Sequence, residues 1–473
     1  MKILLVNPHS SNWTEGRSDK AAVAVRMPPV GILTIAAHLL SEGHSVKLLD
    51  LSAMESAGAV IDFTSVISEF SPQLIGFTTV TSSFHNAYTL AAAAKELSPG
   101  ALTVFGGVHV SALRSSILSD YPAIDLVVTG EGEKAMAEIA SGADFSRIQG
   151  LVFRDGESVR DNGIRRDLFE LDSLPLPAYH LLDGFPHKYE GPLFNYPKAP
   201  TAAVISSRGC PYECSYCDRS VFRSSFRFNS AAYLYNHVSY LNREFGVRHL
   251  FFYDDLFTFN RKRIEDFCNL LMEKPLGITF NCAVRVGHVD DELLRLLKKA
   301  GCWMVSLGIE SGAPEMLARH KSNVSFDQMK DTVDRIRKAG LRAKGLFMMG
   351  LPGETEETIR MTTDFINRLE LDDMNMTKFT PFPGSPLYKC IHEEGAFDER
   401  WDLMNCMNFV FVPSGISSKE RLDELYREFI QGFYTGKNWM RKFPGLMYKS
   451  PDSVKRIFRN LPTFLKIREE FKS

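Results

Sequence analysis

The sequence has neither a long hydrophobic run nor a strong excess of charge of one sign. No stretch of about 20 apolar residues is present, so we expect no membrane-spanning helix. The formal net charge is −2, which gives no reason to expect a nucleic-acid partner. Residues 1–6 begin a strand-like run and lack the charged and apolar regions of a signal peptide, so we expect none.

Cysteine is also sparse. Eight cysteines in 473 residues do not form the disulfide framework of a secreted protein. Five of them are scattered among mostly apolar neighbours, and we expect them to be buried structural thiols: Cys268, Cys282, Cys302, Cys390 and Cys406.

The other three cysteines lie within eight residues, in the order Cys210-Pro-Tyr-Glu-Cys214-Ser-Tyr-Cys217. This spacing lets three thiolates converge on one face of a loop. Structural zinc usually takes four ligands, and no nearby histidine completes such a set. A cube of four irons accepts three protein thiolates and keeps its fourth iron open. Because such a cluster is oxygen-labile, we expect a reducing, cytoplasmic location.

The first 145 residues alternate short apolar runs with helical patterns, which predicts βαβ units and a doubly wound parallel sheet. The expected strands are 2–6, 46–49, 74–79, 103–105 and, as the last, 126–129. Hydroxyl-bearing and glycine-rich segments follow three of them: Thr79-Val80-Thr81, Gly106-Gly107 and Gly130-Glu131-Gly132. Ligands of such sheets bind at these carboxyl ends. No Gly-x-Gly-x-x-Gly follows the first strand, so a dinucleotide is not supported.

The remainder of the chain predicts a linker, a second α/β unit and a helical region. Residues 146–198 are expected to be the linker, because the segment 161–200 has little periodicity and six prolines. Between 199 and 385, six βα repeats predict an open (β/α)6 partial barrel with its chemistry at the carboxyl ends of the strands. Residues 386–473 are expected to be mainly helical.

Several of these motifs resemble those of a known enzyme class. The Cys-x-x-x-Cys-x-x-Cys spacing, with an aromatic residue before the last cysteine, resembles the signature of radical S-adenosylmethionine (SAM) enzymes. The elements of residues 1–145, with Gly106-Gly107-Val108-His109, resemble the cobalamin-binding domain that precedes the cluster domain in one class of them. The loop 217–222, with Phe226-Arg227 after it, is similar to that of the anaerobic magnesium-protoporphyrin ester cyclase and its hopanoid-modifying relatives. The resemblance covers roughly residues 1–385.

This resemblance implies a [4Fe–4S] cluster, SAM and cobalamin as cofactors. The residues that it implies as cluster ligands are Cys210, Cys214 and Cys217. The residues that it implies around SAM are Tyr216, Asp255, Arg285, Glu310 and Ser311. The residues that it implies around cobalamin are Thr79, Thr81, Gly106, Gly107, Gly130, Glu131 and Gly132.

Plainer interpretations of these residues stay open. An aspartate after a strand is often a helix N-cap, which applies to Asp254 more than to Asp255. Arg285 also fits a surface ion pair, Glu310 a solvated loop residue, and the glycines ordinary turns.

The resemblance fails at the signature that donates a histidine to cobalt. In place of Asp-x-His-x-x-Gly the chain has the segment Asn7-Pro8-His9-Ser10-Ser11-Asn12. His9 therefore lacks the usual aspartate that would orient its imidazole. We expect the lower face of cobalt to be unligated by the protein, and His85 and His109 to be polar loop residues.

The implied reaction starts with a 5′-deoxyadenosyl radical, which takes a hydrogen atom from an unactivated carbon of a hydrophobic small molecule. The enzyme then methylates or oxidatively cyclises that carbon. The substrate is expected to be a lipid, a tetrapyrrole or another natural product, and the reductant a flavodoxin or ferredoxin. Two alternatives are a radical SAM enzyme without bound cobalamin and a non-catalytic iron–sulfur or zinc protein.

The C-terminal segment is basic, with ten lysines and arginines against three acidic residues from 437 to 473. Aromatic and aliphatic residues alternate with these charges. One interpretation is peripheral contact with an anionic membrane, which would make the cytoplasmic protein membrane-associated. The other is a basic helical flap packed over the barrel mouth.

Overall fold

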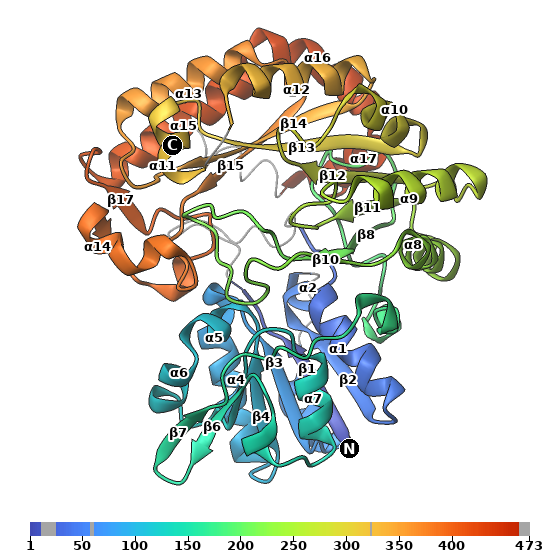
Figure 1. The fold of residues 1–473 in the computed structure, drawn as a ribbon, viewed down its shortest axis with the longest axis vertical. Coiled ribbons are helices and arrows are strands. Elements are labelled where there is room, and N and C mark those ends of the chain that lie inside the picture. Colours follow the sequence, from blue (N-terminus) through green and yellow to red (C-terminus); the bar gives the residue numbers. More distant parts are fainter. Residues whose placement is uncertain (11–24, 57–60, 322–323, 463–473) are drawn as a thin grey trace.

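The computed structural model describes residues 1–10, 25–56, 61–321 and 324–462. Two large sheets form two halves of the molecule, and the loop that carries the three cysteines lies between them (Figure 1). The expected α/β architecture is confirmed, with a doubly wound sheet, a parallel half-barrel and a mainly helical C-terminal region.

The first sheet has the strand order β2-β1-β3-β4-β5-β6-β7. Its strands are β1 (Lys2–Asn7), β2 (Ser45–Asp50), β3 (Leu74–Thr78), β4 (Leu102–Gly106), β5 (Leu126–Val128), β6 (Leu151–Asp155) and β7 (Ser158–Asp161). The first five are parallel, whereas β6 and β7 are antiparallel. The expectation that 126–129 is the last strand was therefore wrong. The missed signal is Asp155-Gly156, a dipeptide typical of tight hairpin turns, with Gly156 at φ +63°.

Helices cover both faces of this sheet. The helices α1 (Val30–Ser41) and α7 (Glu133–Ala140) pack on the face to which Leu5 points. Leu4 points to the opposite face, which carries α3 (Phe63–Phe70), α4 (Phe84–Leu97) and α6 (Ser115–Asp120). Successive side chains of a strand point to opposite faces of the sheet. Because helices cover both faces, both sets of side chains are apolar, and the strands appear in the sequence as continuous hydrophobic runs.

The second sheet is entirely parallel and has the order β15-β14-β13-β12-β11-β8. Its strands are β8 (Thr201–Val204), β11 (His249–Phe252), β12 (Thr279–Val284), β13 (Cys302–Glu310), β14 (Arg342–Met349) and β15 (Asp373–Lys378). The helices between them are α8 (Ala231–Phe245), α9 (Arg261–Glu273), α10 (Asp291–Lys299), α11 (Pro314–His320), α12 (Phe326–Lys338) and α13 (Glu356–Arg368). This curved sheet is the expected half-barrel, with its helices on the outer side (Figure 1).

A short ribbon closes the base of the cysteine-bearing loop. The strands β9 (Ser207–Arg208) and β10 (Arg227–Phe228) pair antiparallel on either side of residues 209–226. Gly209, at φ +88°, begins this segment, and a Cβ there would lie 3.2 Å from the Phe222 Cβ. We call residues 209–226 the cysteine loop.

The C-terminal region returns to the half-barrel. Its main elements are α14 (Ile391–Glu394), β16 (Gly395–Phe397), β17 (Phe411–Pro413), α15 (Lys419–Thr435), α16 (Lys437–Lys449) and α17 (Pro451–Arg459). Lys442 of α16 donates to the carbonyl of Leu371, just before β15, and Arg456 of α17 donates to that of Gly191.

These contacts lie at the amino ends of the barrel strands. The C-terminal helices therefore do not cover the barrel mouth, which is at the carboxyl ends, and the expectation of a flap over the mouth was wrong. The helices pack at this end because Lys442 and Arg456 each bind both a carbonyl and a carboxylate oxygen there. Residues 463–473, which include the expected apolar residues Phe464 and Leu465, lie outside the described residues. Among the helices that are described, none is long and apolar enough to span a membrane.

Candidate active site between the two sheets

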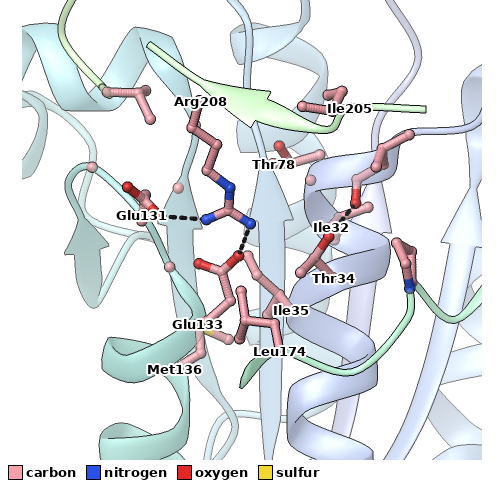
Figure 2. A pocket seen from close by; sticks show the side chains of 18 of the residues that line it. Ile32, Thr34, Ile35, Thr78, Glu131, Glu133, Met136, Leu174, Ile205 and Arg208 are labelled. Carbon is pink, nitrogen blue, oxygen red and sulfur yellow. Dashed lines mark hydrogen bonds and ion pairs between the residues drawn. The ribbon is translucent and has the colours of Figure 1, made fainter. Parts of the chain in front are cut away.

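A cavity that is partly open to solvent lies where the carboxyl ends of the first sheet face the base of the cysteine loop. Its floor is made by small and apolar strand residues, among them Leu5 and Gly76. Ile35 of α1 and Met136 of α7 form its walls (Figure 2). Phe222 of the cysteine loop also lines it. The cavity therefore joins the two halves of the molecule.

Glycines give this cavity its shape. A Cβ on Gly132 would lie 2.8 Å from the Cδ1 atom of Ile35, and one on Gly76 would lie 2.9 Å from the Cδ2 atom of Leu5. Gly107 has φ +104° and ψ −178°, a conformation almost confined to glycine, and a Cβ there would lie 2.5 Å from the Thr79 carbonyl. Such a cradle of absent side chains fits a large ligand that approaches the backbone closely.

Five of the residues implied for cobalamin line this cavity, and two do not. The lining residues are Gly106, Gly107, Gly130, Glu131 and Gly132. Thr78 lines it as well, whereas the Thr79 hydroxyl donates to the Gly106 carbonyl at 2.9 Å and the Thr81 hydroxyl contacts His109 Nδ1 at 3.2 Å. The two threonines thus brace the loops around the cavity.

The three histidines considered near cobalamin lie in different surroundings. His109 is fully buried in α5 (Val108–Leu113) against Trp401, so the expectation of a polar loop residue was wrong for it. Burial lowers the pKa of His109 to about 3, which keeps it neutral. His85 is exposed at the start of α4 and stacks on Trp401 at 5.4 Å. His9 is not among the described residues that line the cavity, and its carbonyl accepts from Asn86.

A buried charge network crosses the cavity between the two halves. Glu131 forms an ion pair with Arg208, and Glu133 Oε1 lies 2.7 Å from Arg208 Nη2 (Figure 2). Glu131 also forms an ion pair with Arg227. Burial lowers the pKa of Arg208, but Glu133 and Glu131 more than offset it, so the pKa is raised and the guanidinium stays charged. Arg208 and Glu133 were not predicted as site residues, because no sequence pattern indicates contact between two residues that lie 75 positions apart.

Two of the three cysteines, Cys214 and Cys217, share one turn of the cysteine loop. The amide of Cys217 donates to the carbonyl of Cys214 at 3.2 Å, and the thiols of Cys210 and Cys217 each feel the charge of Cys214. Cys217 is exposed to solvent, but the protein around it, followed by Asp255 and the other thiols, raises its pKa to about 12.

This donor set fits an iron–sulfur cube better than a single metal ion. Across the described residues, no group of three or more His, Cys, Asp or Glu side chains converges on one ion. In a cube, each thiolate binds a different iron, so the three sulfur atoms need not converge on one point.

Four of the five residues implied for SAM lie in the cysteine loop or around it. Asp255 accepts from the amide of Gly209, and burial raises its pKa. The guanidinium of Arg285 lies 3.8 Å from the ring centroid of Tyr212. Burial raises the pKa of Cys210, and the charge of Arg285 offsets only a small part of this increase. Tyr216 is half-buried, and desolvation, followed by Glu310 and Cys214, raises its pKa.

Glu310 ends β13 in a left-handed backbone conformation, φ +66°, at a break in the strand register. Its Oε1 atom lies 3.0 Å from Nζ of the buried Lys321, which also donates to the Gly308 carbonyl. Strain of this kind persists only where the surroundings enforce it, and it is concentrated at functional sites. Lys321 was not anticipated from the sequence.

Ser311, the fifth residue, points elsewhere. Its hydroxyl is buried, lies 3.1 Å from that of Thr362 in α13 and accepts from the amide of Ala313. Asp254, which precedes Asp255 in the sequence, also has a structural role. Its buried carboxylate accepts from the Ser206 amide and hydroxyl at the junction of β8 and β9. Ser311 and Asp254 therefore hold the frame of the site.

Comparison with known proteins agrees with this arrangement. Residues 204–366 match the Radical SAM superfamily, and residues 16–140 match the B12 binding domain. An uncharacterized methyltransferase of Pyrococcus horikoshii is 32% identical over 82% of this chain and 83% of its own length. The chain belongs to the cobalamin-binding radical SAM family.

Members of this family that resemble the chain include methyltransferases and a cyclase. The anaerobic magnesium-protoporphyrin IX monomethyl ester cyclase of Rubrivivax gelatinosus is 26% identical over 98% of this chain and 82% of its own. The radical SAM methyltransferase TsrM of Kitasatospora setae, solved with cobalamin and a [4Fe–4S] cluster, has the same fold, with a TM-score of 0.66 at 20% identity, over 83% of this chain and 78% of that one. The chain is a radical SAM enzyme of the methyltransferase and cyclase type, with SAM, a [4Fe–4S] cluster and cobalamin as cofactors.

Proposed function

We propose that this enzyme methylates an unactivated carbon of a hydrophobic small molecule, with oxidative cyclisation as the second candidate reaction. The observation that carries the proposal is the position of the cysteine loop, whose base forms part of the roof of the glycine-lined cavity. Reacting groups held close together in a fixed orientation gain a large rate advantage. Methylation comes first because the 32%-identical relative is named a methyltransferase, and cyclisation second because of the cyclase relative.

In this proposal residues 199–385 generate the radical. Cys210, Cys214 and Cys217 hold the cluster, which when bound supplies one electron that cleaves a carbon–sulfur bond of SAM. Asp255 receives the ammonium of SAM, and Arg285 its carboxylate. Glu310 is oriented by Lys321 toward the amino-acid or ribose part of SAM, and the Tyr216 ring borders the adenine.

Residues 1–145 hold cobalamin. Of the expected linker 146–198, β6 and β7 complete the sheet of this domain, and the residues after β7 connect it to the barrel. The backbone at the two glycine segments, Gly106-Gly107 and Gly130-Glu131-Gly132, leaves room for the ligand in the cavity. Thr79 and Thr81 fix the loop beside these segments. When bound, cobalamin supplies a methyl group or carries an electron.

Exposed aromatic side chains near the carboxyl ends of the barrel strands support a hydrophobic substrate. Tyr253 follows β11, Phe259 precedes α9, and both are well exposed. Phe259 packs edge-on against Phe226 at 4.6 Å. Exposed aromatic surface next to polar groups is typical of a binding site, and a lipid or tetrapyrrole is the substrate class that we propose. A flavodoxin or ferredoxin would deliver the electron.

Replacement of a single cysteine tests the radical assignment. Cys214→Ala should lose its iron and should form no 5′-deoxyadenosine from SAM under reducing, anaerobic conditions. Cys390→Ala, a partly buried cysteine outside the cysteine loop, is the control and should retain both. SAM cleavage that survives in Cys214→Ala would contradict the assignment.

SAM that carries a deuterated methyl group distinguishes the two reactions. A methyltransferase transfers the label, so the product mass rises by one labelled methyl group. A cyclase leaves the label on methionine, and its product mass falls by the hydrogens removed. Candidate lipids and tetrapyrroles are incubated with the reconstituted enzyme, and the products are measured by mass spectrometry.

The C-terminal helices favour peripheral contact with an anionic membrane. Tyr448 is 87% exposed on α16 and Phe458 is 70% exposed on α17, beside Lys449 and Lys455. Apolar and basic side chains on one surface are typical of interfacial helices. The full-length protein should float with phosphatidylglycerol vesicles but not with phosphatidylcholine vesicles, and Tyr448→Asp with Phe458→Asp should abolish flotation. Flotation that the double variant retains would refute this contact.

A further inference from the structure

Two arginines face each other at the base of the cysteine loop. Arg208 of β9 and Arg227 of β10 are directly opposite in the antiparallel ribbon that closes this loop. Like charges at opposite positions of a ribbon repel and destabilise it. Without other contacts, this repulsion would therefore separate β9 from β10, the two strands that flank the three cysteines.

Glu131 of the first half of the molecule removes this repulsion. One of its carboxylate oxygens pairs with Arg208 and the other with Arg227. Glu133 binds the second nitrogen of Arg208 at 2.7 Å. The side chains of Glu131 and Glu133 are 9% and 5% exposed, so solvent screens these pairs little.

The same two glutamates line the cavity of the first sheet. Farther along the cysteine loop, the Ser220 hydroxyl donates to the carbonyl of Val108 at 3.1 Å. The loop is thus attached to the first half of the molecule at its base and beyond the cysteines. A change in the cavity loop 130–133 must move the base of the cysteine loop, because both arginines are held by it.

We propose that Glu131 and Glu133 are positioning residues that couple the two cofactor sites. A ligand that fills the cavity holds the loop 130–133 in the arrangement that also clamps Arg208 and Arg227. Cluster assembly requires the same clamped base, so each event raises the affinity of the other, and the coupling is reciprocal. This inference rests on the proposed assignment of cobalamin and the cluster to these sites.

Cobalamin affinity, measured with and without the cluster, tests the coupling. The full chain is titrated anaerobically with hydroxocobalamin, before and after iron–sulfur reconstitution, and Kd is taken from the change in absorbance. In the wild-type protein the cluster should lower Kd by about 5-fold or more. In Glu131→Gln this ratio should fall to about 1, because neutral Gln cannot offset two cations.

Glu138→Gln is the matched control. It removes the ion pair with Arg165 on the same half of the molecule and does not touch the cysteine loop. This variant should keep the wild-type ratio. Glu133→Gln leaves Glu131 between the two arginines and should lower the ratio only in part, and the melting temperature of each cofactor-free variant shows that it is folded.

The outcomes separate the coupling from the function on which it rests. A wild-type ratio of about 1, or a folded Glu131→Gln that keeps the wild-type ratio, overturns the coupling while both cofactors still bind. If Glu131→Gln does not fold, Glu133→Gln decides, and an unchanged ratio in it overturns the proposal. Wild-type protein that binds no hydroxocobalamin refutes the proposed function, and the coupling fails with it.

Discussion

Glu310 and Lys321 illustrate how a motif residue depends on a partner that the motif does not contain. The resemblance to radical SAM enzymes implied Glu310 as a residue near SAM. It gave no indication that Glu310 adopts φ +66° or that the buried Lys321 holds its carboxylate. A strand pattern predicts where a residue lies along the chain, whereas the backbone angle and the distant partner follow from tertiary packing.

Ser311 shows the same limit in the opposite direction. Its position beside Glu310 made it a candidate for SAM contact, yet its hydroxyl faces Thr362 and the amide of Ala313. Ser311 lies just beyond the end of β13, where Glu310 has already left the extended conformation, so a strand pattern does not predict which way its side chain points. The cysteines, by contrast, could be assigned from the sequence because their spacing is local.

Glu354 should make the stability of the protein depend on pH. It is fully buried between β14 and α13, where the Gly350 and Leu351 amides donate to its carboxyl group, and burial raises its pKa from 4.5 to about 8. The folded protein keeps the proton up to about pH 8, whereas the unfolded chain releases it above pH 4.5. The free energy of unfolding should therefore fall as pH rises through this interval, by at most about 1.4 kcal/mol per unit.

Glu354→Gln tests this dependence, because glutamine keeps an acceptor oxygen and does not ionise. Chemical denaturation at several pH values from about 5 to 8 should show a flatter profile for this variant than for the wild type. The exposed Glu273→Gln is the control and should keep the wild-type profile. An equally steep decline in Glu354→Gln would mean that the carboxyl group is ionised in the folded protein.

At the scale of secondary structure, long periodic elements were predictable and short ones were not. The six strands of the half-barrel and the long helices between them form the βα repeats that the sequence predicts between residues 199 and 385. The hairpin of β6 and β7 and the helix α11 were missed. Each is too short for a hydrophobic period to emerge, and only local signals remain: Asp155-Gly156 for the hairpin and Pro314 at the first turn of α11.

The helix α17 should contribute to stability without affecting the chemistry. Arg456 is buried, donates to the Gly191 carbonyl at 2.6 Å and lies 3.0 Å from Glu190. Arg456→Met should lower the free energy of unfolding by about 2 kcal/mol, because a buried carbonyl loses a charged donor. The rate of 5′-deoxyadenosine formation should stay unchanged, since α17 lies at the end of the barrel opposite the cysteines.

Arg459→Met provides the matched control for this helix. Arg459 pairs with the same Glu190 but is 64% exposed, so its loss should cost less than about 0.5 kcal/mol. Both variants are measured by urea denaturation and by an anaerobic cleavage assay. Equal destabilisation by the two substitutions would show that the pair with Glu190, and not the buried bond to Gly191, anchors the helix.

At the scale of the whole molecule, three contacts from distant segments make the two halves one unit. Arg208 reaches Glu131 and Glu133 across the cavity, Ser220 reaches Val108, and Trp401 of the C-terminal region packs against His109. None of these contacts has a signal in the sequence, because each joins segments that are far apart in the chain and have no shared periodicity. The presence of two cofactor domains could be predicted from local motifs, but the charged interface between them could not.

Trp401 should control both the attachment of the C-terminal region and the protonation of His109. Its ring lies 4.5 Å from that of His109 and 5.4 Å from that of Phe84. Trp401→Ala should remove about 2 kcal/mol of stability, less than for a fully buried tryptophan because Trp401 is partly exposed. The loss should also admit water to His109 and raise its pKa from about 3 toward its ordinary value of 6.5.

The sign of the pH effect follows from that shift. In the wild type His109 stays neutral in the folded state while the unfolded chain takes up a proton below about pH 6.5, so stability declines as the pH falls from 6.5 toward 3. Trp401→Ala should show a shallower decline, because His109 can then be protonated in the folded protein too. Trp439→Ala is the control: it removes a ring that packs on Tyr434 and Phe443, away from His109, and should leave the decline as steep as in the wild type. Denaturation curves between about pH 4 and pH 7 measure the three slopes, and an unchanged slope in Trp401→Ala would mean that other contacts keep His109 dry.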